Sequence, residues 1–152
     1  MNTLAVFEID GVLSCSARAR AVMKRALRRL DWDVVVVTAR HSTRSRETLA
    51  WLADRFGIDR LPKPCCAHHC GRATPTETFG AKLRTLQTLL RQHHAIDRLV
   101  CYEHDVTVLS AYDQTIRSRE RPRSYSLYCV GSKDPIMLYG SAVQRTEPSE
   151  FW

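Results

Sequence analysis

The sequence lacks the segments that direct a protein into or across a membrane. It has no run of about 18 or more apolar residues, the length that a transmembrane helix needs. Its N-terminus has no basic segment followed by an apolar signal region. We therefore expect an intracellular protein, cytoplasmic or nuclear, that is neither secreted nor membrane-bound. The chain also lacks an internal repeat and a linker, and its 152 residues are too few for two ordinary domains. One domain is expected, with its core over about 3–130 and an edge element and tail over 131–152.

Lysine is scarce: the chain has only four lysines beside 19 arginines. Its net charge is +7. The planar guanidinium group suits phosphates, so an anionic partner such as RNA or DNA is one interpretation. The other is a GC-rich coding sequence and a solvated surface, since charge alone says nothing about the fold. Composition alone does not decide between these two interpretations of the arginine excess.

The six cysteines give no clear disulfide framework. Several fall in stretches expected to be buried strands, which favours free thiols or a metal over disulfides. Three of them belong to one dense cluster, Cys65-Cys66-Ala67-His68-His69-Cys70. Zinc sites usually combine two such clusters about a dozen residues apart. A mobile loop near the active site is therefore the favoured interpretation of this cluster, and a zinc site is the alternative.

Apolar runs bounded by polar residues predict a sheet. Val34 to Val37 is wholly apolar and β-branched, which is typical of a parallel strand covered by helices on both faces. Residues 58–61 form at most a short strand, and the last dozen residues are expected to be a surface tail. The predicted strands cover 3–9, 34–37, 99–102, 125–130 and, at an edge, 136–139.

Between these strands, apolar residues recur at helical spacing. Ser16 and Thr76 are suited to cap the first and third helices, and Gly57 to end the second. Residues 62–75 contain three prolines and predict a loop. The predicted helices cover 17–30, the segment after Thr43 up to Phe56, about 77–93 and 106–116. Strands that alternate with helices predict a doubly wound, Rossmann-like α/β fold with a parallel sheet.

Polar side chains follow three of the predicted strands. Glu8 and Asp10 follow the first, Thr38 the second, and Glu103 and Asp105 the strand 99–102. In a doubly wound sheet, ligands bind at the carboxyl ends of the strands. The sequence therefore predicts a functional site where these three ends meet.

Together these residues resemble the haloacid dehalogenase (HAD) superfamily of phosphotransferases. Its first motif, Asp-x-Asp-Gly-[Thr/Val]-Leu, is matched by Glu8-Ile9-Asp10-Gly11-Val12-Leu13, and its second by the valine run that ends in Thr38. Lys82 matches the third motif, and Leu-Val-Cys-Tyr-Glu103-His104-Asp105 the fourth. The resemblance covers about 3–130. With Thr38-Ala39-Arg40, it is most similar to the HAD domains of RNA repair proteins and polynucleotide 3′-phosphatases.

This resemblance implies a role for each residue. Glu8 stands at the position of the nucleophile, and Asp10 at that of the general acid and base. Thr38 and Lys82 would stabilise the transferring phosphoryl group, with Gly11, Ala39 and Arg40 beside the substrate. A Mg²⁺ ion would be held by the oxygens of Glu8, Asp10, Glu103 and Asp105.

Two departures from the family pattern affect activity. Glu8 replaces the family's Asp and moves the carboxylate by about one bond length, ~1.5 Å, while His104 stands where the repair-type pattern has an acid. Only about 24 residues separate Leu13 from Thr38, which indicates a minimal cap or none and an open site for a large substrate. We therefore expect a Mg²⁺-dependent phosphatase or phosphotransferase acting on nucleic-acid ends. The alternative is a catalytically impaired module that binds nucleic acid or a protein partner.

Overall fold

The fold is built on one six-stranded sheet. A computed structural model describes residues 2–131 and 134–141, and the strands run in the order β3-β2-β1-β4-β5-β6. The first five strands are parallel, and β6 pairs antiparallel with β5 at the edge, as predicted for 136–139. The strands are β1 (Thr3–Phe7), β2 (Trp32–Thr38), β3 (Cys66–His69), β4 (Arg98–Glu103), β5 (Ser124–Cys129) and β6 (Ile136–Gly140).

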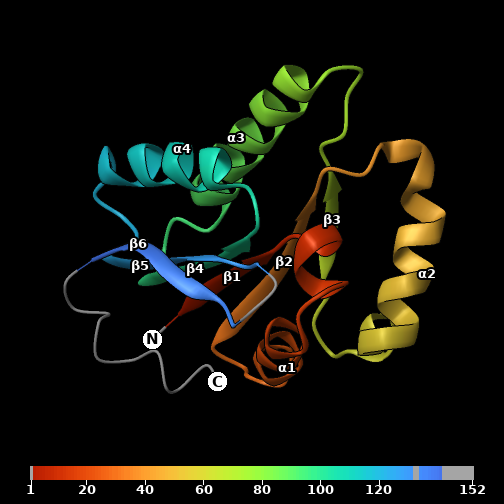
Figure 1. The fold of residues 1–152 in the computed structure, drawn as a ribbon. Helices are drawn as coiled ribbons and strands as arrows, with labels where there is room; N and C mark the ends of the chain where they lie inside the picture. Colours follow the sequence, from red (N-terminus) through yellow and green to blue (C-terminus); the bar gives the residue numbers. More distant parts are fainter. Residues whose placement is uncertain (1, 132–133, 142–152) are drawn as a thin grey trace.

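Helices cover both faces of this sheet, two on each face (Figure 1). Residues of the first two helices share one buried cluster, and residues of the last two share a second cluster on the opposite face. The helices are α1 (Ala17–Ala26), α2 (Ser45–Phe56), α3 (Pro75–Gln92) and α4 (Val106–Arg117). The predicted doubly wound α/β fold is thus confirmed. In residues 2–131, each connection between successive strands consists of one α-helix with its flanking turns.

The strand β1 is central because both of its faces are buried. Leu4 and Val6 belong to the cluster under α3 and α4, whereas Ala5 and Phe7 belong to the cluster under α1 and α2. This alternation follows from the two-residue period of a strand. It places the chain that follows β1 at the centre of the carboxyl edge.

Two predicted helix boundaries are confirmed by their caps. The Ser16 hydroxyl oxygen accepts a bond from the Ala19 amide, and α2 ends at Gly57 in the left-handed conformation with φ 63°. The first helix ends at Ala26 rather than at residue 30, where Leu30 is 82% exposed and has no core to pack against.

Three local predictions were wrong. The segment 62–75 is not all loop, because Cys66–His69 forms the edge strand β3 and pairs with β2. Residues Ile58–Arg60 form one turn of 3₁₀ helix instead of a short strand. Thr74, not Thr76, caps α3: its hydroxyl oxygen accepts from the Glu77 amide, and Pro75 occupies the first helical position.

The predicted surface tail lies mostly in 142–152, outside the described residues. Among the described residues, no helix combines the length and the apolar character needed to cross a membrane.

Candidate functional site

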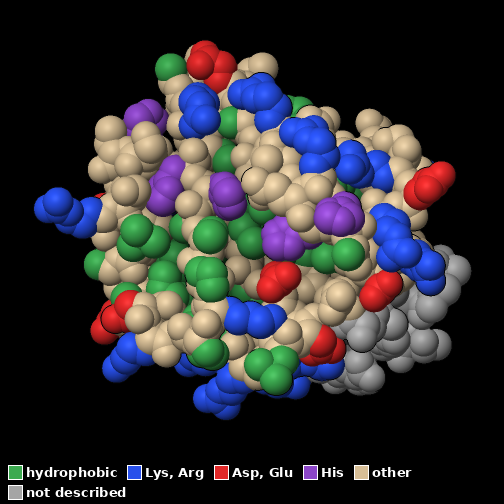
Figure 2. Space-filling view, turned by 180° about the vertical axis from the view of Figure 1, so that it is seen from behind, with side chains coloured by type: hydrophobic (Ala, Val, Ile, Leu, Met, Phe, Trp, Pro, Cys, Tyr) green, Lys and Arg blue, Asp and Glu red, His purple; other side chains and the backbone are tan. Residues whose placement is uncertain are grey.

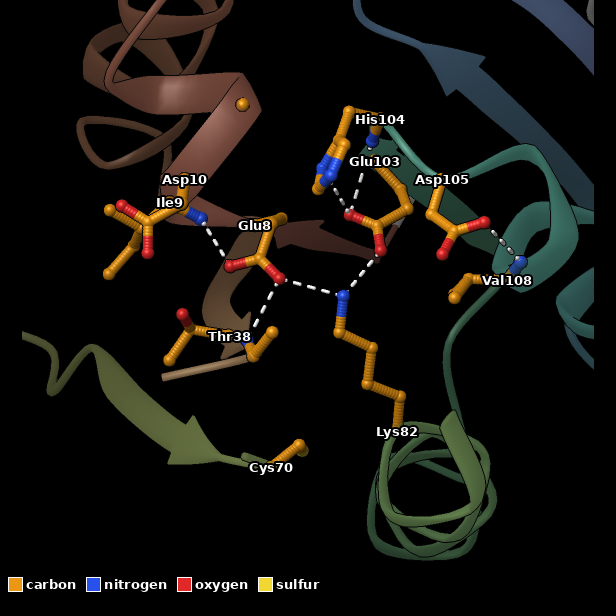
Figure 3. A network of polar contacts seen from close by, with 12 residues as sticks. Glu8, Ile9, Asp10, Thr38, Cys70, Lys82, Glu103, His104, Asp105 and Val108 are labelled. Atoms are coloured by element: carbon orange, nitrogen blue, oxygen red, sulfur yellow. Dashed lines mark hydrogen bonds and ion pairs between the residues drawn. The ribbon is translucent and has the colours of Figure 1, made fainter. Parts of the chain in front are cut away.

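The three strand ends that the sequence singled out meet at one edge of the sheet. Phe7 of β1 pairs with Val36 of β2 on one side and with Tyr102 of β4 on the other. The next residue, Glu8, therefore lies between Thr38 and Glu103 (Figure 3). This is the point where the order of the strands reverses, the usual ligand position in such a sheet.

Glycine is required in the turn that follows β1. Gly11 has φ 80°, and a Cβ at this position would lie 2.8 Å from Cγ and Nδ1 of His104. Its amide donates to the Ser14 hydroxyl at 3.2 Å. The tight turn Ile9–Leu13 thus brings the His104 ring over the first motif.

The Glu8 carboxylate is almost completely buried, at 2% exposure, and both of its oxygens accept hydrogen bonds. Oε1 accepts from the Ile9 amide at 2.7 Å, and Oε2 accepts from the Ala39 amide at 2.9 Å. Oε2 also lies 2.7 Å from Nζ of Lys82. Burial raises the pKa of Glu8, and the Lys82 cation opposes this shift. Ala39, predicted beside the substrate, binds Glu8 through its backbone amide.

Lys82 bridges two carboxylates, because its Nζ lies 2.5 Å from Oε1 of Glu103 as well as beside Glu8. In Figure 3 the three side chains are directed toward one another from β1, α3 and β4. Burial alone lowers the pKa of Lys82, but Glu103 and Glu8 outweigh it and raise that pKa. The sequence motifs therefore converge as predicted for Glu8, Thr38, Lys82 and Glu103.

His104 is joined to the same group. Its amide donates to Oε2 of Glu103 at 3.2 Å, and its Nδ1 lies 3.7 Å from that oxygen. Contact with Glu103 raises the pKa of His104. Because its side chain is 46% exposed, the ring can also meet a ligand at the mouth.

Asp10 and Arg40 bind each other and stand apart from the Lys82 bridge. The guanidinium donates to both Asp10 carboxylate oxygens, each at 2.9 Å, and lies over the Trp51 ring at 6.0 Å. These bonds lower the pKa of Asp10. Asp10 is thus held as a carboxylate, and the Arg40 guanidinium already binds that carboxylate.

The predicted Mg²⁺ ligands are all engaged by protein donors. Glu8 and Glu103 bind Lys82, Asp10 binds Arg40, and Asp105 caps α4 by accepting from the Thr107 and Val108 amides at 2.9 and 3.4 Å. In residues 2–131 and 134–141, no three His, Cys, Asp or Glu side chains are grouped to hold a metal ion. As arranged, these residues do not fit Mg²⁺, and the Lys82 ammonium occupies the position between the two buried acids.

The Cys/His cluster is spread over opposite faces of the edge strand. Cys65 packs against the α1/α2 core, Cys70 is buried in the α3/α4 core, and Cys66 is exposed. All six cysteines are free thiols. The strand delivers the following residues to the site, because the Cys70 and Gly71 amides donate to the carbonyls of Thr38 and Arg40 at 2.8 and 3.1 Å.

A hollow of about 370 Å³ opens beside Lys82. Its lining includes Ala39, Arg72, Thr78, Lys82, His104 and Asp105. Two of the lining residues, Arg72 and Phe79, were not among the predicted site residues. The pattern Thr74-Pro75-Thr76-Glu77, a capping box with proline at the first helical position, would have placed Arg72 directly before the helix that carries Lys82.

Comparison with known proteins provides evidence for the fold alone. No protein-family model matches this chain, and no curated protein matches it. Among solved structures it is similar to UDP-GlcNAc 2-epimerase from Methanocaldococcus jannaschii, with 14% sequence identity and a TM-score of 0.50. The likeness covers 78% of this chain and 29% of the epimerase chain. It identifies the Rossmann-like α/β architecture as one shared with a part of a larger protein.

Proposed function

We propose that this chain is a HAD-like domain that binds the terminal phosphate of a nucleic acid in the hollow above Lys82, with little or no turnover. One observation carries the proposal. The Lys82 ammonium lies between Glu8 and Glu103, at 2.7 and 2.5 Å, and each Glu8 oxygen also accepts a hydrogen bond from a backbone amide.

This arrangement disfavours the chemistry implied by the family resemblance. The Lys82 ion pair and two backbone amide bonds draw charge from the Glu8 oxygens and lower their nucleophilicity. A general acid must hold a proton near neutral pH, but Arg40 lowers the pKa of Asp10. The longer side chain of Glu8 adds a misplacement that can cost about 10²-fold in rate.

The hollow beside Lys82 has features that suit phosphate binding. Lys82, Arg72 and His104 line the hollow together with Thr74 and Pro75, so the N-terminus of α3 also borders it. Cationic side chains and the positive end of a helix dipole both attract phosphate. With no cap over the site, a polymer end has room to enter, and the excess of arginine supports an anionic partner.

A Mg²⁺-dependent phosphatase acting on nucleic-acid ends is the second candidate. The convergence of Glu8, Thr38, Lys82 and Glu103 favours it, since four separate motif positions meet in one place. It requires the present contacts of Glu8 and Glu103 to be exchanged for metal contacts. A protein partner at the mouth remains a further alternative. For all of these we propose an intracellular setting, which the six free thiols support.

One experiment separates the two candidates. The purified protein is incubated with Mg²⁺ and either a 3′-phosphorylated oligonucleotide or an aryl phosphate, and phosphate release is compared among wild type, Glu8→Ala and Glu8→Asp. We expect wild type to match the Glu8→Ala background and Glu8→Asp to exceed it, by up to about 10²-fold. Glu120→Asp, the same change at an exposed position, is the matched control.

Release by wild type well above the Glu8→Ala background would overturn the binding-only proposal and favour the phosphatase. Binding is measured in parallel with fluorescent oligonucleotides that differ only in a 3′-phosphate or a 3′-hydroxyl. Equal affinity for the two ends, or no binding at low salt, would overturn the proposed phosphate site.

A further inference from the structure

A second, smaller hollow adjoins the one above Lys82. It has a volume of about 170 Å³ and is lined by His68, Arg72, Ala81, Arg84, Thr85 and Thr88. Arg72 lines both hollows, so they share a wall. No carboxylate is among the residues that line the second hollow.

The geometry of α3 explains why the two hollows are neighbours. Thr78 and Lys82 face the first hollow, one turn apart, while Ala81, Arg84, Thr85 and Thr88 follow the helical period on the adjacent face. From Lys82 to Thr85 the chain advances three residues, which is about 4.5 Å along the axis and about 60° around it. The hollows therefore form one path that winds along α3 away from the site.

The chemistry of this path suits a polyanion. Arg72 and Arg84 are exposed, and Arg84 has no ion-pair partner in the part of the chain that the structure describes. The Arg72 Nη1 atom donates to the His69 and Gly71 carbonyls at 3.2 and 2.9 Å, which fixes the guanidinium between the hollows. Thr85 and Thr88 add hydroxyl groups, which commonly bind phosphate oxygens.

Charge on the surface agrees with this path. Figure 2 shows His, Lys and Arg side chains across the upper half of this face, with few acidic side chains among them, and further Lys and Arg side chains along its lower edge. The second hollow is small beside the roughly 300–1,000 Å³ of ordinary small-molecule sites. Its size and charge suit one phosphate group of a chain better than a separate metabolite.

We propose that the second hollow is a subsite for an internal phosphate of a single-stranded nucleic acid whose end phosphate lies above Lys82. The inference rests on the proposed function, because the first hollow fixes the end of the strand. Arg72 contacts the strand between the two phosphates, and Arg84 and the two threonines hold the inner one. The protein thereby selects an oligonucleotide over a mononucleotide.

The test compares three probes by equilibrium binding to the full chain: thymidine 3′-monophosphate, a short oligothymidylate with a 3′-phosphate, and the same oligothymidylate with a 3′-hydroxyl. We expect the phosphorylated oligothymidylate to bind at least about tenfold more tightly than the mononucleotide. Arg84→Ala removes most of this gain and lowers the salt slope of log K by about 0.7, as expected for one lost contact to a single strand.

Arg28→Ala is the matched control, because Arg28 is an exposed arginine just after α1, on the opposite face of the sheet. We expect Arg28→Ala to leave unchanged both the salt slope and the preference for the phosphorylated oligothymidylate over the mononucleotide. Equal affinity for the mononucleotide and the phosphorylated oligothymidylate, or equal effects of the two variants, would overturn the subsite while leaving the end-phosphate site standing. Failure of both phosphorylated probes to bind would overturn the proposed function itself. A phosphoserine peptide that displaces the oligothymidylate better than inorganic phosphate does would reassign the path to a protein partner.

Discussion

Nζ of Lys82 lies 2.7 Å from Oε2 of Glu8, and both side chains are at least 95% buried. Glu103 completes the group at 2.5 Å from the same ammonium. A buried charge is tolerated only when it is paired, so the two acids depend on this one lysine. The site is therefore also a structural element of the fold.

Replacing Lys82 by methionine leaves two buried carboxylates without a cation. We expect Lys82→Met to lower the free energy of unfolding by about 3–5 kcal/mol, measured by urea denaturation. Adding Glu103→Gln to this variant restores part of the loss, because it removes one uncompensated charge. The exposed lysine of α1 provides the control: Lys24→Met changes stability by about 0.5 kcal/mol or less. Equal losses in the two single variants would contradict the buried bridge.

Replacing Tyr102 by phenylalanine is expected to stabilise the protein. Its ring stacks between Phe7 and Tyr128, with centroid distances of 5.0 and 4.8 Å, but its hydroxyl is buried and has no hydrogen-bond partner among the described residues. Tyr102→Phe keeps the stack and removes the unpaired group, so we expect a gain of about 1 kcal/mol in thermal or urea denaturation.

The same substitution should destabilise the protein at Tyr125, whose hydroxyl donates to Oδ1 of Asp113 at 2.6 Å. Tyr125→Phe should cost about 1.5–3 kcal/mol, the range for a bond to a charged group. Destabilisation by Tyr102→Phe would show that its hydroxyl is paired after all.

Gly71 allows the chain after β3 to pass close to the second motif. A Cβ at this position would lie 2.4 Å from the Ala39 carbonyl oxygen and 2.6 Å from the His41 amide nitrogen. These are backbone atoms that cannot turn aside, so Gly71→Ala should cost about 1–3 kcal/mol. It should also weaken oligonucleotide binding by displacing Arg72. Gly131→Ala, with nothing within 4 Å of the added Cβ, serves as the control and should be neutral. A neutral Gly71→Ala would refute the close passage.

The six thiols should differ widely in reactivity. Cys15 and Cys66 are exposed, whereas Cys101 is buried, and burial raises the pKa of Cys65 to about 12. Since the thiolate is the reactive form, an alkylating reagent at mildly alkaline pH should label Cys15 and Cys66 first and Cys65 slowly. Mass spectrometry of the labelled peptides measures the order. Zn²⁺ should not change it, and joint protection of Cys65, Cys66 and Cys70 by Zn²⁺ would instead indicate a zinc site.

The sequence predicted the central part of the molecule because its signals there are local and repeated. Apolar, β-branched runs such as Val34 to Val37 are typical of buried parallel strands, and polar residues that follow such strands lie at the carboxyl edge. Glu8, Thr38 and Glu103 converge for this reason, whereas Lys82 lies on α3 and was indicated by the family resemblance.

Other features depend on contacts between distant residues that local patterns do not reveal. The strand β3 exists because β2 offers its edge to a proline-flanked segment with little strand character of its own. Arg40, expected beside the substrate, binds Asp10 in the folded chain, and Asp105, expected on a metal, caps α4. In each case one side chain suits both roles, and only the fold decides between them.

The sheet separates the protein into two halves that share no buried residue between their apolar clusters. Substitutions in well-separated places usually have additive effects. Changes in the layer that carries Lys82 and Arg84 therefore leave the packing of α1 and α2 intact. Exposed residues of the α3 side, such as Arg84, can change without disturbing the other half, whereas the buried Lys82 bridge cannot be removed without a loss of stability.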